Sequence, residues 1–199
     1  WIWRTRAEAL HKAIPIASDL IESCAARFTH LPEHPRELRG PFGERNLYRI
    51  LPRGVALVLA EDEDAVTESL LMNILAGNPV ILGTGEGLVR MAEAQRLAGA
   101  LTIDNAISIQ SVEPATLTDI SPDLICLDER AAAIWRGHLV HAFEQIIPLA
   151  FVGDDADRFV VERVTSINTA AIGGDVELLS GYKRAEEDMR LSRMQVPDG

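Results

Sequence analysis

Between residues 55 and 152, short apolar runs alternate with segments whose apolar residues recur every three or four positions. Val55–Ala60 is apolar throughout, as expected for a central strand of a sheet that is covered on both faces. The next segment ends at Gly77 and has a helical spacing of apolar residues. Because parallel strands need a long crossover, usually a helix, this alternation predicts an α/β fold: a Rossmann-like, mainly parallel sheet with helices on both faces.

The other elements follow the same rhythm. Strands are expected over residues 47–51, 79–82, 106–110, 123–127 and 146–152, and helices over residues 66–75, 85–97 and 129–143. An amphipathic N-terminal helix is expected over residues 4–28, where Pro15 should kink or break it because proline removes a backbone donor. A helix over residues 155–163 and a β-branched strand over residues 164–169 should complete the fold.

Composition divides the chain into four parts. Residues 1–43 hold the N-terminal helix and a proline-rich connector, and residues 44–153 hold a degenerate Rossmann-like core. Residues 154–181 are expected to form a helix and a projecting β-flap, and residues 182–199 a polar tail. A chain that opens on Trp1 instead of Met is expected to be a fragment of a longer one.

The charge and the cysteines exclude some function classes. A net charge of −11 at pH 7 repels phosphate backbones and anionic headgroups, so neither nucleic acid nor a membrane is an expected partner. Cys24 and Cys126 both lie among apolar residues, which predicts two buried, reduced thiols instead of a nucleophile or a disulfide. Reduced thiols, with no apolar run long enough to cross a bilayer and no signal peptide at the start, indicate a cytoplasmic protein.

A dinucleotide site of the Rossmann type needs glycines between the first strand and its helix, so that backbone amides can approach a phosphate. The corresponding turn, Glu61–Asp64, has four carboxylates, which suit a helix N-terminus but repel a pyrophosphate. The only glycine-rich turn from a strand into a helix lies at Gly83–Gly87, and without a lysine it favours a tight loop. This turn is the best candidate for a nucleotide or anion site, with binding residues Gly83, Gly85, Glu86 and Gly87.

The histidines form no convincing catalytic or metal set. His138, His141 and Glu144 stand at steps of three on one expected helix, but a metal site would need a further ligand from elsewhere. Exposed helix surface is therefore expected there. Three further histidines have no serine, cysteine or aspartate motif beside them: His11, His30 and His34.

Two motifs carry a resemblance to a known family. The first is Gly40-Pro-Phe-Gly-Glu-Arg-Asn46, with Phe42 where the family has threonine, and the second is Ile167-Asn-Thr-Ala-Ala-Ile-Gly-Gly-Asp175. Together they resemble the C-terminal, aldehyde-dehydrogenase-superfamily-like domain of the bifunctional proline utilization A family. The residues matched in the first motif are Gly40, Pro41, Gly43, Glu44, Arg45 and Asn46. The resemblance spans about residues 4–179, and between 87 and 155 only the pattern carries it.

The resemblance implies a parent enzyme that oxidises proline with FAD and the resulting glutamate semialdehyde with NAD, passing the intermediate through an internal channel. In that family the C-terminal domain is non-catalytic and holds no cofactor. It packs on the catalytic aldehyde dehydrogenase domain, of the same chain or of a paired protomer, and helps to seal the channel. By resemblance, the interacting flap comprises Val164, Ser166, Ile167, Asn168, Thr169, Gly173 and Gly174.

The chain departs from active aldehyde dehydrogenases where those enzymes bind and react. They carry a lysine where this chain has Gly83 and a Trp-Asn pair where it has Glu61–Asp64, although Glu86 matches a family glutamate. Neither cysteine matches their nucleophile. The leading hypothesis is therefore a non-catalytic interaction domain. Two alternatives stay open: an oxidoreductase-like or sensor domain with a nucleotide or anion site at Gly83–Gly87, and self-association through the flap.

Overall fold

The computed structural model describes residues 3–40, 43–101 and 106–168. Their contacts divide them into two compact units, each described by itself. Residues 3–34 and 50–163 form the larger one, called the parallel-sheet unit below, and residues 35–49 and 164–168 form the smaller one. The expected flap residues Thr169, Gly173 and Gly174, the tail over 182–199 and Pro41 of the first motif lie outside the described residues.

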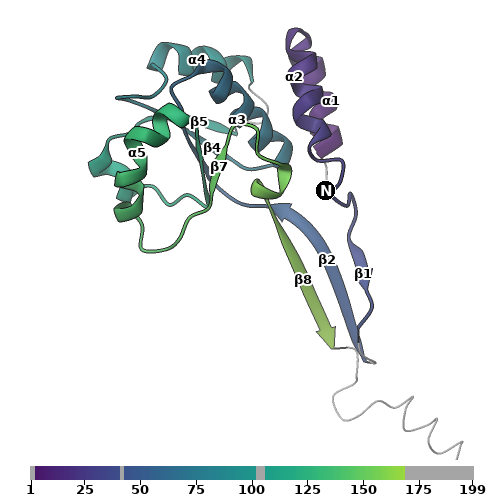
Figure 1. Cartoon of the computed structure of the whole chain (residues 1–199). Coiled ribbons are helices and arrows are strands. Elements are labelled where there is room, and N and C mark those ends of the chain that lie inside the picture. The colour runs from purple at the N-terminus through teal and green to yellow at the C-terminus, as the bar shows by residue number, and fades with distance from the viewer. Residues whose placement is uncertain (1–2, 41–42, 102–105, 169–199) are drawn as a thin grey trace, which may run out of the picture. The chain divides into compact units, whose positions relative to one another are not determined.

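Five parallel strands form the centre of the parallel-sheet unit (Figure 1). They are β3 (Ala56–Leu59), β4 (Val80–Thr84), β5 (Ile107–Ser111), β6 (Leu124–Leu127) and β7 (Leu149–Phe151). Their order is β5-β4-β3-β6-β7, and every neighbouring pair is parallel. The predicted α/β class with a parallel sheet is confirmed.

Helices connect these strands on both faces of the sheet. The crossovers contain α3 (Glu63–Ala76), α4 (Met91–Ala100), the short 3-10 helix η2 (Pro114–Asp119) and α5 (Glu129–Ala142). From β3 the chain moves outward first to β4 and β5 and later to β6 and β7, so right-handed crossovers place α3 and α4 on one face and α5 on the other. The packing agrees with this arrangement. Leu57 of β3 shares a buried cluster with Trp135 of α5, whereas Cys126 of β6, which faces the other side of the sheet, is contacted by Asn73 of α3. Helices on both faces are therefore confirmed.

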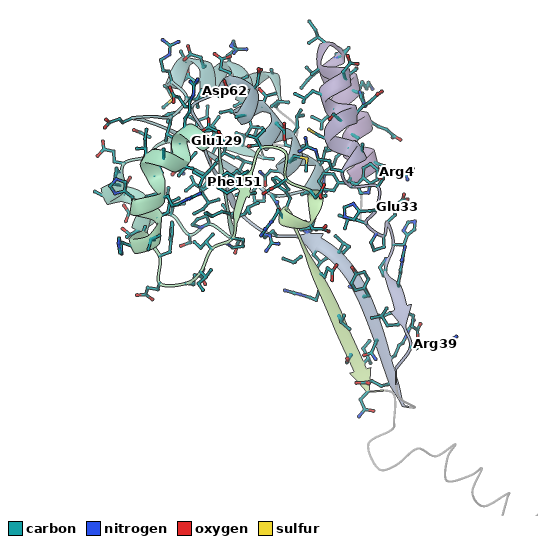
Figure 2. The ribbon with its side chains drawn as sticks, in the orientation of Figure 1. Arg4, Glu33, Arg39, Asp62, Glu129 and Phe151 are labelled. Atoms are coloured by element: carbon teal, nitrogen blue, oxygen red, sulfur yellow. The ribbon has the colours of Figure 1, made fainter. Side chains whose placement is uncertain are left out.

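The N-terminal segment is broken at Pro15, as the sequence predicts. A helix over residues 4–28 is replaced by α1 (Trp3–Ala13), the 3-10 turn η1 (Pro15–Ala17) and α2 (Ser18–Ala26). Both α-helices contact α3. The Trp3 and Phe28 rings stack with their centroids 6.1 Å apart, and Arg4 pairs with Glu33 at 2.5 Å (Figure 2). These contacts hold the helix pair as one element of the parallel-sheet unit.

A second, three-stranded sheet has the order β1-β2-β8. Its strands are β1 (Arg36–Leu38), β2 (Glu44–Pro52) and β8 (Val160–Asn168). β1 and β2 are antiparallel, with Leu38 opposite Asn46. β1 lies in the segment predicted to be an irregular connector. The prolines of this segment favour that prediction, and a strand of three residues is too short to show a pattern of its own. No described helix is both long and apolar enough to cross a membrane.

Two helix predictions are wrong. The helix expected over residues 155–163 is only the 3-10 turn η3 (Ala156–Arg158), after which β8 begins, because β-branched residues such as Val160 and Val161 favour a strand. The helix expected from residue 85 begins only at Met91. Gly85 and Gly87, with φ values of 156° and 65°, hold a loop conformation that a helix cannot contain.

Candidate functional site

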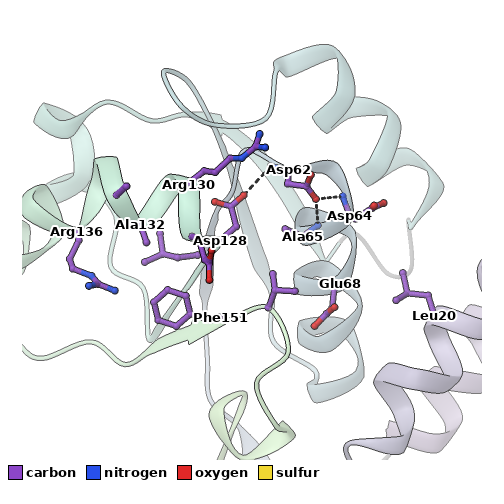
Figure 3. A pocket seen from close by; sticks show the side chains of 14 residues that line it. Leu20, Asp62, Asp64, Ala65, Glu68, Asp128, Arg130, Ala132, Arg136 and Phe151 are labelled. Atoms are coloured by element: carbon purple, nitrogen blue, oxygen red, sulfur yellow. Dashed lines mark hydrogen bonds between the residues drawn. The ribbon is translucent and has the colours of Figure 1, made fainter.

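The carboxyl edge between β3 and β6 is the first place to look for a site. The strand order reverses direction there, and open α/β sheets bind their ligands at such switch points. A cavity of about 1110 Å³ opens at this edge, beside the N-termini of α3 and α5 (Figure 3). Its charged lining residues are Asp62, Asp64, Glu68, Asp128, Glu129, Arg130 and Arg136. Carboxylates outnumber guanidinium groups in this lining, which disfavours an anionic ligand.

Asp128, the residue that follows β6, already holds the amide groups of this edge. Its side chain is buried, and its Oδ2 accepts the N–H groups of Glu61 and Asp62 at 2.8 and 2.9 Å. Its Oδ1 accepts the N–H group of Ala131, in the first turn of α5, at 2.6 Å. Backbone donors at strand-to-helix turns are what Rossmann folds offer to a phosphate. Here an internal carboxylate takes that position.

The amides at the start of α3 are held in the same way. Asp62 is the N-cap, and its Oδ1 accepts the N–H groups of Asp64 and Ala65 at 3.0 and 3.1 Å (Figure 3). Glu63 and Asp64 occupy the first turn, where negative charge suits the helix dipole. The interpretation of the acidic run as a dipole-matched helix start is confirmed.

The glycines of the turn at 83–87 are accounted for by close packing. A Cβ atom on Gly83 would lie 2.6 Å from Cδ2 of Leu59, and one on Gly85 would lie 2.7 Å from the carbonyl oxygen of Val112. A Cβ on Gly87 would overlap Cδ1 of Ile134. A lysine, which active aldehyde dehydrogenases carry at the first of these positions, would therefore require the Leu59 side chain to shift. Glu86 is exposed. The geometry favours the tight loop, and the anion site there stays a prediction.

Both thiols are buried, as predicted, and neither is activated. Burial raises the pKa of Cys24 to about 11 and that of Cys126 to about 12, so both are protonated at neutral pH. The Asn73 amide donates to Cys126 Sγ at 3.3 Å. A protonated thiol without access to solvent is a poor nucleophile.

His138, His141 and Glu144 are all exposed. The expected exposed surface at these positions is confirmed, although α5 ends at Ala142 and Glu144 lies beyond it. His138 lies edge-on to the Trp135 ring, with centroids 6.2 Å apart. Within the described part of the chain, no three histidine, cysteine or acidic residues gather closely enough to hold a metal ion.

The structure brings the two family motifs together in the three-stranded sheet. The hydroxyl of Ser166, which directly precedes the second motif in β8, donates to Oδ1 of Asn46 in β2, although 120 residues separate them. Arg45, the neighbour of Asn46, pairs with Glu37 of β1 at 3.2 Å. A Cβ on Gly40 would overlap the side chain of Asn46, so this glycine allows the close approach. The described residues of both motifs therefore serve one sheet.

Three residues make decisive contacts that sequence reasoning did not predict: Asp128, Arg53 and Asn78. The last two lie in stretches, residues 52–55 and 75–78, that resemble the aldehyde dehydrogenase cofactor domain. A signal for the first existed, because an aspartate between an apolar strand and a helix is a typical N-cap. The other two bind backbone carbonyls far along the chain, and no local pattern reports such contacts.

Comparison with known proteins agrees with this architecture. No family model matches the chain. The bifunctional protein PutA of Escherichia coli is 32% identical over 155 residues, which is 73% of this chain and 11% of that protein. The PutA protein of Rhizobium meliloti is 28% identical over 163 residues, which is 72% of this chain and 12% of that protein. The chain is homologous to a segment of PutA.

Solved structures show the same fold. A crystal structure of Bradyrhizobium japonicum proline utilization A has a TM-score of 0.53 at 18% identity, over 68% of this chain and 15% of that one. An NAD-dependent benzaldehyde dehydrogenase from Corynebacterium glutamicum has a TM-score of 0.51 at 16% identity, over 75% of this chain and 39% of that one. The fold is therefore aldehyde-dehydrogenase-like. The chain spans only about a tenth of the PutA relatives it matches.

Proposed function

We propose that this chain is a non-catalytic interaction domain of a PutA-type bifunctional enzyme. In this proposal it packs on the catalytic aldehyde dehydrogenase domain, of the same polypeptide or a paired protomer, and helps to seal an internal channel. The parent enzyme oxidises proline with FAD and glutamate semialdehyde with NAD in the cytoplasm, while this domain binds neither cofactor. The observation that carries the proposal is a sheet that lacks a buried face.

The three-stranded sheet has almost no core of its own. All three residues of β1 are exposed, as are residues 162–168 of β8, and among residues 44–49 of β2 none is buried. A small sheet needs a buried apolar face to be stable in water, so a second surface is expected to cover this one. β8 is also a terminal strand in the order of the described strands, and such edges pair readily with other chains.

The exposed side chains of the sheet suit an apolar partner. Leu38, Val164 and Ile167 are exposed by 41%, 52% and 42%. Leu38 is opposite Asn46, which also contacts Ser166, and Val164 stands two residues before that serine. Since alternate residues of a strand share a face, Leu38 and Val164 lie on the same face of the sheet. Ile167, three residues from Val164, lies on the opposite face. The proposed docking surface is therefore the strand β8 itself, which exposes apolar side chains on both of its faces.

Three features of the parallel-sheet unit support a role without dinucleotide binding. Asp128 and Asp62 accept the amide donors at the switch point. Gly83 stands where active aldehyde dehydrogenases carry a lysine, and a Cβ there would require the Leu59 side chain to shift. The thiols are buried and protonated. A site with filled donors, a carboxylate-rich lining and no activated nucleophile suits scaffolding better than hydride transfer.

Calorimetric titrations test the proposal. We expect no saturable heat with NAD and saturable binding to a separately produced aldehyde dehydrogenase domain of a PutA-type enzyme. The double variant Val164→Asp/Ile167→Asp should weaken that binding by about tenfold or more, because two charges would be buried at the interface. Val140→Asp, at an exposed position of α5, is the matched control and should leave binding unchanged.

Other outcomes of these titrations would decide against the proposal. Saturable NAD binding would favour the nucleotide-binding alternative. A doubled mass of the chain alone in light scattering, lost in the Val164→Asp/Ile167→Asp variant, would favour self-association. Unchanged partner binding in the double variant would show that β8 lies outside the interface.

A further inference from the structure

The beginning of β8 is held by two side chains that lie 81 to 107 residues earlier in the chain than the carbonyls they bind. Arg53 Nε donates to the carbonyl of Arg158 at 2.6 Å, and its Nη2 donates to the carbonyls of Asp157 and Val160 at 3.2 and 2.7 Å. Asn78 Nδ2 donates to the carbonyl of Phe159 at 2.8 Å. Four successive carbonyl groups, Asp157–Val160, are thus bound by two side chains.

The chain around Arg53 is shaped to aim this side chain. The next residue, Gly54, has a φ of 131°, and a Cβ there would overlap the carboxylate of Asp123. That carboxylate accepts the N–H group of Val55 at 2.8 Å, which sets the turn between β2 and β3. The glycine is therefore required by the turn, and the turn places Arg53 beside the start of β8.

Asn78 is the second half of the arrangement. It is almost fully buried, with 1% of its surface exposed, and its Oδ1 accepts the N–H group of Gly54 at 3.2 Å. Its Nδ2 also donates to Oδ1 of Asn73 in α3 at 3.0 Å. One amide thereby joins α3, the turn before β3 and the beginning of β8. A buried amide in such a network is costly to remove, because it leaves several groups unpaired.

The arginine contributes charge as well as geometry. Partial burial lowers the pKa of Arg53, and the positive charge of Arg158 lowers it further. The guanidinium still carries its charge, since an arginine does not deprotonate in a protein. Hydrogen bonds from a charged donor are stronger than neutral ones, so the three carbonyls offset the cost of burying part of the side chain.

We propose that Arg53 and Asn78 form a clasp, defined as these two side chains and the carbonyls of Asp157–Val160, that anchors the beginning of β8. Arg53 is then a positioning residue. It keeps the start of the strand bound to the parallel-sheet unit, while the residues from Glu162 onward stay exposed. The clasp does not depend on the proposed function. Any contribution of the clasp to partner binding, however, rests on the proposed function.

Amide hydrogen exchange of the 199-residue chain, followed by mass spectrometry, tests the clasp. In Arg53→Met, which keeps most of the apolar stem, amides of residues 157–163 should exchange about tenfold faster or more, because charge-assisted hydrogen bonds are lost locally. Amides of β3 and β6 should change by less than about twofold. Arg90→Met, which removes an exposed arginine paired with Glu93, is the control and should leave residues 157–163 unchanged.

Trypsin provides a second readout, since Arg158 and Arg163 are both exposed cleavage sites. Cleavage there should accelerate in Arg53→Met in step with exchange. Unchanged exchange at residues 157–163, or an equal rise throughout the parallel-sheet unit, would overturn the clasp. If Arg53→Met does not fold, Arg53→Lys decides: a local rise supports the clasp, and no rise overturns it. A local rise in a chain that binds no dehydrogenase domain would keep the clasp and reject the proposed function.

Discussion

The parallel-sheet unit and the three-stranded sheet treat their surfaces in opposite ways. In the first, every residue of β3 and β6 is buried, and the buried carboxylate of Asp128 has three amide donors. In the second, the residues of β1 and most of β8 are exposed, including apolar side chains such as Val164. The parallel-sheet unit buries its apolar strands and pairs its amide donors internally, while the three-stranded sheet leaves apolar side chains exposed for another surface to cover. A substitution should therefore cost stability in one region and binding in the other.

The largest loss of stability is expected from Gly83→Lys, which restores the family's lysine. The new Cβ would lie 2.6 Å from Leu59 Cδ2, and the side chain would push a charge against the buried face of β3. Overpacking and charge burial together should lower the free energy of unfolding by about 3 kcal/mol, measured by urea denaturation.

Gly137→Ala provides the matched control for this substitution. A Cβ on this exposed glycine of α5 meets nothing within 4 Å, so the free energy of unfolding should rise by about 0.5 kcal/mol through helix propensity. A stable Gly83→Lys variant that binds NAD would break the comparison, because the parallel-sheet unit would then be a cofactor site lacking one residue.

Asp128→Ala should have the next largest effect. It removes the acceptor of the N–H groups of Glu61, Asp62 and Ala131, and a buried donor without an acceptor destabilises the folded state. We expect a loss of about 2 kcal/mol in the same denaturation measurement. Added sulfate should recover part of this loss if the amides accept an external anion. Asp119→Ala, at an exposed position, should change stability by less than about 0.5 kcal/mol.

The same contrast explains which parts of the structure could be predicted from the sequence. The alternation of apolar strands and amphipathic helices gives the parallel sheet, because periodicity reports local burial. It gives neither β1 nor the true start of β8, since these short or exposed strands are held by distant contacts such as Arg53 with Val160. Likewise, the acidic run at Glu61–Asp64 predicts a helix start, but the role of Asp128 depends on a strand pairing that no local pattern contains.

Alkaline pH should weaken the parallel-sheet unit through its thiols. The folded-state pKa of Cys24 is about 11 against an ordinary 9.0, so the unfolded chain loses this proton first as the pH rises. The stabilisation is complete below pH 9 and is lost progressively up to about pH 11. At pH 10 this one thiol should account for about 1 kcal/mol of lost stability. Cys24→Ala should show a correspondingly smaller fall between pH 8 and 10, and an equal fall in both proteins would contradict the prediction.

The smallest effect on stability, and the sharpest contrast, is expected from Val164→Asp/Ile167→Asp. Both side chains are already about half exposed to water, so the free energy of unfolding of the isolated chain should change by less than about 0.5 kcal/mol. If the sheet is completed by a dehydrogenase domain, the same variant should also reduce the partner's stabilisation of the chain, measured as a smaller rise in thermal midpoint when the two proteins are mixed. A large loss of stability in the isolated chain would mean that these residues are covered within this protein, and the distinction between the two regions would fail.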